Sequence, residues 1–123
     1  MTLQELYESI GGSYEQALRV LRVDKLVDKH IRKFEKNGVV EALLTAGEAM
    51  EPTRMFETAH AVKGVSGNLG LTEIFELASL LSEEFRPGNP RTLSDDAVRD
   101  KLDALGALYR KTAESIRAYE ENG

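Results

Sequence analysis

The chain has 123 residues, enough for a single hydrophobic core of modest size, so we expect one domain spanning residues 1–123. Its 16 lysines and arginines are outnumbered by 21 aspartates and glutamates, and the resulting net charge of −5 argues against general binding to nucleic acid. The chain has no cysteine, so we expect no disulfides and no thiolate metal sites. It does not start with a signal peptide, and no apolar run approaches the roughly 20 residues of a membrane span, so we expect a cytoplasmic protein.

The first part of the chain carries three sets of apolar residues at helical spacing. The first set predicts a short helix that Gly11 and Gly12 end: Leu3, Leu6, Tyr7 and Ile10. A second set follows Ser13, a suitable N-cap: Tyr14, Ala17, Leu18 and Leu21. A third set is rotated by about 140° from the second: Val20, Val23, Val27, Ile31 and Phe34. Two interpretations stay open, either one long helix that changes the neighbours it packs on or a break near Val23-Asp24.

Basic residues follow the same stretch at helical spacing: Arg22, Lys25, Lys29, Arg32 or Lys33, and Lys36. A stripe of charge is usually a solvated face, although this one would also suit an acidic partner. His30 lies beside the third apolar set without a motif around it, so we interpret it as structural. Asn37 and Gly38, which favour a left-handed cap, end the segment.

Four further helices are predicted beyond Gly38. Residues 39–50 form a short amphipathic helix, and Pro52, suited to a first helical turn, opens a central helix of about 52–69. Thr72 is expected to cap the next helix, whose apolar stripe is continuous: Ile74, Phe75, Ala78, Leu81 and Phe85. A loop at 86–91 leads to a last helix, capped by Ser94 or Asp95 and running to about Tyr119.

No segment alternates with the period of two that is typical of strands. Several amphipathic helices with short connections bury their apolar stripes most simply by packing side by side. We therefore predict an all-α fold, an antiparallel four-helix bundle with one or two additional short helices, the shortest of which covers one end.

The central helix has two different faces. Its apolar or small residues lie within about 80° of one another: Met55, Ala59, Val62, Ser66 and Leu69. His60 points almost the opposite way, into solvent. Its neighbours one or two turns away are Phe56, Lys63, Gly64 and Gly67. Glycine inside a helix costs about 0.5–1 kcal/mol relative to alanine, so two glycines beside one histidine indicate that something approaches this surface closely.

Six residues of the segment 59–70 stand at a spacing that matches a known sequence signature: Ala59, His60, Lys63, Gly64, Leu69 and Gly70. The segment resembles the signature of histidine-containing phosphotransfer (HPt) domains, Ala-His-x-x-Lys-Gly followed by small residues and a Leu-Gly pair. Members of this family are four-helix bundles with added helices, in agreement with the apolar pattern. The Asn37-Gly38 break interrupts a region that many members keep helical.

The resemblance implies a carrier in a two-component phosphorelay. His60 would accept a phosphoryl group from a receiver-domain aspartate and pass it to another receiver, because a neutral imidazole, with an ordinary pKa of about 6.5, is nucleophilic near neutral pH. Lys63 would neutralise the added charge, and Gly64 and Gly67 would clear room for the partner. The imidazole nitrogen involved stays open, with exposure favouring Nε2.

Other positions are assigned by the same resemblance or by their place on the helix. Counted from His60 without a gap, Ser82 stands where several members have a glutamine that bonds the histidine or phosphate; either the shorter serine supports His60 less well or Glu83 orients the imidazole. Ser66 is interpreted as a small packing residue that bonds back to the i−4 carbonyl. Partner contacts are expected at Phe56, Glu57, Gly64, Gly67 and Asn68, with Phe56 equally suited to packing on the adjacent helix.

The partners implied are response-regulator receiver domains, which would supply Mg²⁺ with the aspartate, and a hybrid or other sensor histidine kinase. The chain itself is expected to need no cofactor or metal, to be a monomer and not to be an enzyme, since it has no ATP-binding segment. Met1 and a full set of bundle helices favour a free-standing protein.

Three other functions compete with the phosphorelay role. A pure interaction module would bind a receiver-like partner without transfer, but it would not need both His60 and Lys63. A metal or hydrolytic site around His60 fails on the number of ligands, because the only other histidine is distant and no His-x-x-x-His pair exists. A helical scaffold without chemistry is the third.

Overall fold

The structure is a computed structural model that describes residues 1–122, and within them it contains seven α-helices, one 3₁₀ turn and no strand. In chain order the elements are α1 (Leu3–Ser9), α2 (Tyr14–Leu21), α3 (Asp24–Lys33), η1 (Glu35–Asn37), α4 (Val39–Ala49), α5 (Pro52–Asn68), α6 (Thr72–Glu84) and α7 (Asp95–Asn122). The all-α prediction is confirmed, and the helix ends after residue 38 lie within a few residues of those expected.

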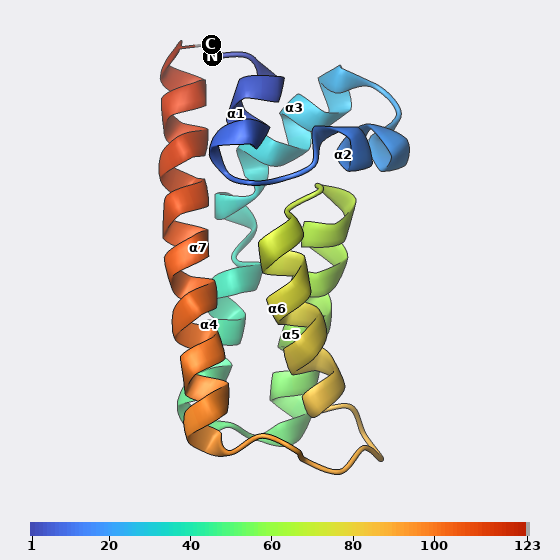
Figure 1. Ribbon diagram of the computed structural model, residues 1–123, viewed down its shortest axis with the longest axis vertical. Coiled ribbons are helices and arrows are strands. Elements are labelled where there is room, and N and C mark those ends of the chain that lie inside the picture. Colours follow the sequence, from blue (N-terminus) through green and yellow to red (C-terminus); the bar gives the residue numbers. More distant parts are fainter. Residues whose placement is uncertain (123) are drawn as a thin grey trace.

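The last four helices form an antiparallel bundle. α5 packs against α4 and α6, and α7 packs against the same two helices from the other side. Successive helices run in opposite directions along the long axis of the molecule, as Figure 1 shows. Short connections permit this up-and-down arrangement, because each helix returns directly beside the one before it. The predicted four-helix bundle is therefore present.

The amino-terminal helices cover one end of this bundle, above α5 and α6 in Figure 1. α7 has 28 residues and is about 42 Å long, so it spans both the bundle and this end layer. The Tyr7 hydroxyl of α1 donates a hydrogen bond of 2.6 Å to the Leu69 carbonyl oxygen at the end of α5. Three short α-helices form this layer rather than the expected one or two, because the chain breaks between α2 and α3.

The break resolves the open question about residues 14–34. Arg22 adopts φ 77° and ψ −39°, a sparsely populated backbone conformation that costs a residue with a side chain about 1–3 kcal/mol, and Val23 is extended. The turn lets α2 bury Ala17 while α3 buries Val27 and Ile31 against other neighbours. Assigning Val20 and Val23 to the buried set was wrong, since they lie at the corner and are 41% and 50% exposed.

Most predicted helix starts are confirmed by their hydrogen bonds. Ser13 Oγ accepts from the Gln16 N–H at 3.1 Å, and Ser94 Oγ accepts from the Ala97 N–H at 3.1 Å. The expectation for Thr72 was wrong: it is the first residue of α6, and its hydroxyl lies 3.4 Å from the Gly70 carbonyl oxygen. Leu71 occupies the N-cap position without a side-chain bond, because the tight turn after α5 leads straight into α6.

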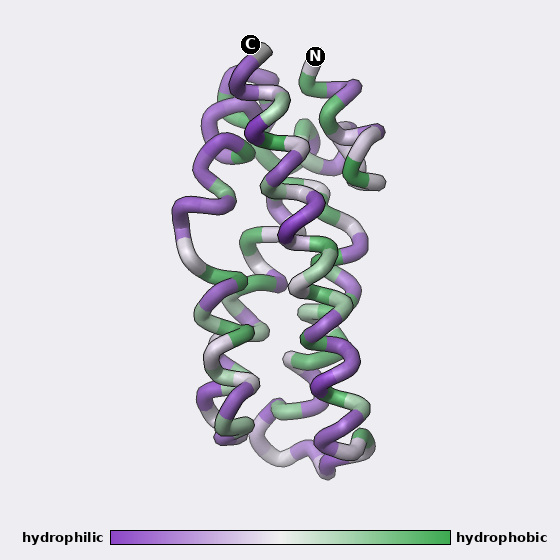
Figure 2. The backbone as a smooth tube through the Cα atoms, turned by 90° about the vertical axis from the view of Figure 1, so that its left-hand side faces the viewer, coloured by the Kyte–Doolittle hydropathy of each residue, from purple (hydrophilic) through white to green (hydrophobic). Residues whose placement is uncertain are grey.

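The core is a continuous set of buried apolar residues from all seven α-helices. Figure 2 shows hydrophobic residues interspersed with hydrophilic ones along the helices, as expected where each helix has one face in the core and one in solvent. None of the helices described is both long enough and apolar enough to cross a membrane.

A buried carboxylate organises the loop between α6 and α7. The side chain of Glu84 accepts hydrogen bonds from the N–H groups of Thr92 and Leu93, both at 2.8 Å, and from the Thr92 hydroxyl at 2.7 Å. Arg91 adds an ion pair at 3.0 Å. Burial alone would raise the pKa of Glu84, but these donors outweigh it and lower the pKa to about 2. The carboxylate is therefore more strongly bonded in the folded chain than in the unfolded one.

We expect Glu84→Gln to reduce the free energy of unfolding by about 2 kcal/mol at pH 7, because charge-assisted bonds become neutral ones. The stabilisation from a lowered carboxyl pKa is complete above the ordinary pKa of 4.5 and is lost as the pH falls from there towards 2. Urea unfolding of both proteins should show the difference between them shrinking across this window. Glu76→Gln, at an exposed position of α6, is the control. A difference independent of pH would contradict this account.

Candidate functional site

α5 presents His60 to solvent because its opposite face is locked into the core. Met55, Ala59 and Val62 are fully buried, as predicted. Ser66 is also fully buried, and its hydroxyl donates a 2.6 Å bond to the Val62 carbonyl oxygen, the i−4 bond expected from the sequence. These contacts set the rotation of α5 about its axis.

Both ends of α5 are held by capping groups. The Glu51 carboxylate accepts from the N–H groups of Thr53 and Arg54 at 3.2 and 2.8 Å, at the positive end of the helix dipole. At the other end Gly70 adopts φ 67°, and the Leu71 N–H donates to the Ser66 carbonyl oxygen at 2.9 Å. This is a Schellman motif, so the Leu-Gly pair of the signature serves here to end the helix.

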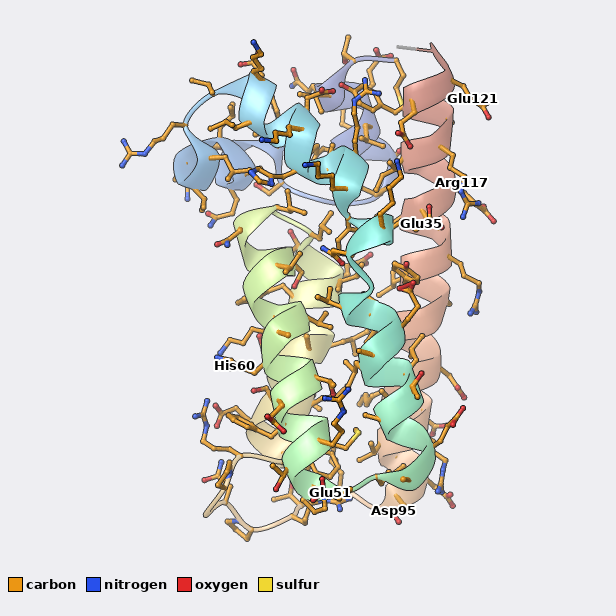
Figure 3. All side chains as sticks on the ribbon, turned by 180° about the vertical axis from the view of Figure 1, so that it is seen from behind. Glu35, Glu51, His60, Asp95, Arg117 and Glu121 are labelled. Carbon is orange, nitrogen blue, oxygen red and sulfur yellow. The ribbon has the colours of Figure 1, made fainter. Side chains whose placement is uncertain are left out.

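His60 is exposed and projects from the outer side of α5, away from α7, in Figure 3. Its imidazole stacks on the Phe56 ring one turn earlier, with ring centroids 5.5 Å apart and planes 27° apart. Phe56 is half-buried and also packs against the core, so it contacts the protein's own interior as well as His60. A rigid aromatic surface therefore restricts one side of the imidazole.

Charged groups at the end of α6 and just beyond it border the Phe56 ring that supports the histidine. The Arg86 guanidinium lies 5.3 Å from the centroid of the Phe56 ring and forms an ion pair with Glu83 at 2.8 Å. Hydrogen bonding to Arg86 holds the pKa of Glu83 below its ordinary value, and the charge of Lys63 acts in the same direction. Within the described part of the chain Lys63 makes no ion pair of its own. The site thus combines one exposed imidazole with two nearby cations.

The two glycines of the site differ. A Cβ atom built on Gly64 would meet nothing within 4 Å, so no contact inside the chain requires a glycine there. A Cβ atom on Gly67 would lie 3.0 Å from the Phe75 ring, so this glycine has a packing reason in the contact between α5 and α6. The open space beside His60 is therefore best attributed to Gly64.

The remaining expected residues lie in different surroundings. Glu57 and Asn68 are exposed on α5. Ser82 is fully buried on α6, and its Oγ has no hydrogen-bond partner among the described residues, so it makes no bond to His60 in this structure. His30, interpreted as structural, is exposed on α3 rather than packed in the core.

Sequence reasoning did not identify Arg86 or Asn89 as neighbours of the site. Asn89 Nδ2 donates to the Glu83 backbone oxygen at 3.1 Å and lies 3.4 Å from its carboxylate. The one local signal for the ion pair was the spacing of Glu83 and Arg86, which stand three residues apart where α6 ends and the following loop begins. Contact with Phe56 depends on how α6 packs on α5, which that spacing does not reveal.

The family model described as Hpt domain matches residues 27–110, about two thirds of the chain and including the whole segment from Phe56 to Asn89. The chain belongs to the Hpt domain family. No curated protein and no solved structure gives a significant match to this Hpt chain.

Membership assigns a general role to the protein. Hpt domains serve in histidine phosphotransfer within two-component phosphorelays, where they interact with receiver domains and kinases, and they are carriers of phosphoryl groups rather than kinases. Among the described residues of this Hpt chain, no group of three or more His, Cys, Asp or Glu side chains is arranged to hold a metal ion.

Proposed function

We propose that His60 accepts a phosphoryl group from the aspartyl phosphate of a response-regulator receiver domain and passes it to the aspartate of another receiver. The observation that carries this proposal is the exposed imidazole, supported on one side by Phe56, next to the open space over Gly64. A partner's active-site loops need such space, because the reacting atoms must come within about 3–3.5 Å of each other.

The transfer step is a displacement at phosphorus. The unprotonated imidazole nitrogen of His60 attacks, an N–P bond forms and the P–O bond to the partner's aspartate breaks, which returns that aspartate to a carboxylate. The other ring nitrogen keeps its proton or releases it to solvent. Passing the group on reverses these steps with a second receiver.

The chain contributes positioning and charge. Lys63, one turn after His60, supplies positive charge for the phosphoryl oxygens. Phe56 limits the orientations of the imidazole. We assign partner contacts to Phe56, Glu57 and Asn68, around the open space over Gly64. Gly67 contributes to the site indirectly, because it permits the close packing of α5 on α6. The Mg²⁺ needed for the chemistry would be supplied by the receiver, and the carrier would act as a monomer with no cofactor of its own.

The experiment mixes the protein with a panel of phosphorylated receiver domains and follows transfer on a phosphate-affinity gel, with His60→Gln alongside. We expect an acid-labile, alkali-stable phosphoprotein in the wild type and none in the variant, because only the imidazole supplies the nucleophile. His60 is exposed, so the variant should keep the unfolding free energy of the wild type. Binding of a receiver without transfer to the wild type would instead make the protein an interaction module.

A further inference from the structure

Arg86 is held at the edge of the site by two groups. Its Nε and Nη2 atoms both donate to Glu83 Oε1, at 2.9 and 2.8 Å, and its guanidinium lies over the Phe56 ring that stacks on His60. His60 projects from α5 into solvent in Figure 3, and the side chains of Arg86 and Glu83 are themselves partly exposed. The cation nearest the imidazole's aromatic support is thus already paired with a carboxylate.

A phosphoryl group on His60 would present the same kind of ligand as that carboxylate. Guanidinium groups bind carboxylate and phosphate oxygens through the same planar set of N–H donors, and a phosphoryl group carries more charge. The two donors that Arg86 gives to Glu83 are not free for phosphate while the ion pair lasts. Glu83 therefore holds two of the donors with which Arg86 could otherwise bind a phosphoryl oxygen.

We propose that Glu83 is a positioning residue that competes with the phosphoryl group on His60 for Arg86, so that the carrier releases its phosphoryl group more readily. This inference rests on the function proposed above. If Glu83 did not compete, Arg86 would bind the phosphoryl group on His60 more strongly. Transfer from the phosphorylated carrier to the next receiver would then be less favourable.

Three details of the structure fit this role. Asn89 donates to both the backbone and the carboxylate of Glu83, so the carboxylate keeps a partner when Arg86 leaves it. Hydrogen bonding to Arg86 lowers the pKa of Glu83, and the positive charge of Lys63 acts in the same direction, so both cations favour the charged carboxylate. The side chains of Arg86 and Glu83 are 40% and 56% exposed, so separating them costs little and the exchange is reversible.

The first test measures the equilibrium of phosphoryl transfer between a receiver and the carrier. Glu83→Gln should raise the equilibrium constant in favour of phosphorylated His60 by about 1.5- to fivefold, the range for exposed ion pairs. Glu76→Gln, which removes the same charge from an exposed position of α6, should leave it unchanged. No rise with Glu83→Gln, while the wild type transfers normally, would overturn this inference and leave the proposed function intact.

The same measurement in an Arg86→Gln background separates competition from simple repulsion. If Glu83 acts by holding Arg86, adding Glu83→Gln to Arg86→Gln should have no further effect on the equilibrium. An equal rise in both backgrounds would show that Glu83 repels the phosphoryl group directly, and would overturn the proposed competition.

A third arm needs no partner protein. His60 is loaded chemically with phosphoramidate, and the Arg86 Nε–H signal is followed by ¹⁵N NMR. We expect phosphorylation to shift this signal in the wild type as the guanidinium exchanges carboxylate for phosphate, and Glu83→Gln to change it before loading. A signal unaffected by phosphorylation would overturn the inference even if no receiver in the panel transfers its phosphoryl group.

Discussion

Replacing Gly64 by leucine is expected to slow phosphoryl transfer to His60 by about 100-fold or more without unfolding the protein. No atom of the chain lies within 4 Å of the position of its Cβ, so the new side chain would project into the space through which a receiver must reach the imidazole. Leucine is also a better helix former than glycine, so the free energy of unfolding should stay equal or rise by up to about 1 kcal/mol. Single-turnover transfer and urea unfolding measure the two effects separately.

The matched control is Ala107→Leu, which adds a leucine at an exposed position of α7, a helix that packs on α4 and α6. It should leave the transfer rate unchanged. If Gly64→Leu transfers as fast as the wild type, the partner does not approach over Gly64, and the docking part of the proposed function is wrong. A large loss of stability in Gly64→Leu would contradict the open space seen in the structure.

Replacing Gly70 by alanine is expected to lower the free energy of unfolding by about 3 kcal/mol or more. Its φ of 67° is costly for any residue with a side chain, and a Cβ atom there would lie 2.1 Å from the Ser13 carbonyl oxygen. That oxygen belongs to the backbone at the start of α2, and the Ser13 N–H donates to the Gly70 carbonyl oxygen at 2.8 Å. The clash would therefore separate the turn after α5 from the end layer.

Gly38→Ala supplies the control for this prediction. Gly38 has almost the same dihedral, φ 71°, but a Cβ atom there would meet nothing within 4 Å. Gly38→Ala should therefore lower the free energy of unfolding only by the cost of the left-handed conformation, about 1–2 kcal/mol. Equal losses in urea unfolding for the two variants would show that the contact with Ser13 relaxes freely and that packing at Gly70 is unimportant.

The helices and the outward position of His60 could be predicted from the sequence. Both depend on local spacing, because residues three and four apart share a helix face whatever the helix packs against. The burial of Met55, Ala59 and Val62 followed from this rule, and with it the exposure of His60 on the opposite side. The signature around His60 is equally local, and it led to the family that the match over residues 27–110 shows.

Predictions that depended on which elements meet were less successful. Ser82 was matched to a supporting position by counting from His60, with the alternative that Glu83 orients the imidazole; in the structure Ser82 is buried and its Oγ bonds no described residue. Val20 and Val23 fitted a helix stripe, yet they are exposed because the chain turns at Arg22. In each case the local pattern was compatible with two packings, and the free energy of the whole core selects between them.

The sequence by itself determined the all-α class, the bundle and the outward position of the histidine that we propose as the phosphoryl carrier, because helical periodicity and a short motif are properties of neighbouring residues. Only the tertiary structure decided that Arg86 reaches Phe56, that Gly67 makes room for Phe75 while Gly64 faces open space, and that Gly70 meets Ser13. The physical reason is that these contacts join separate helices, whose distances and rotations are set when all the apolar faces are buried together.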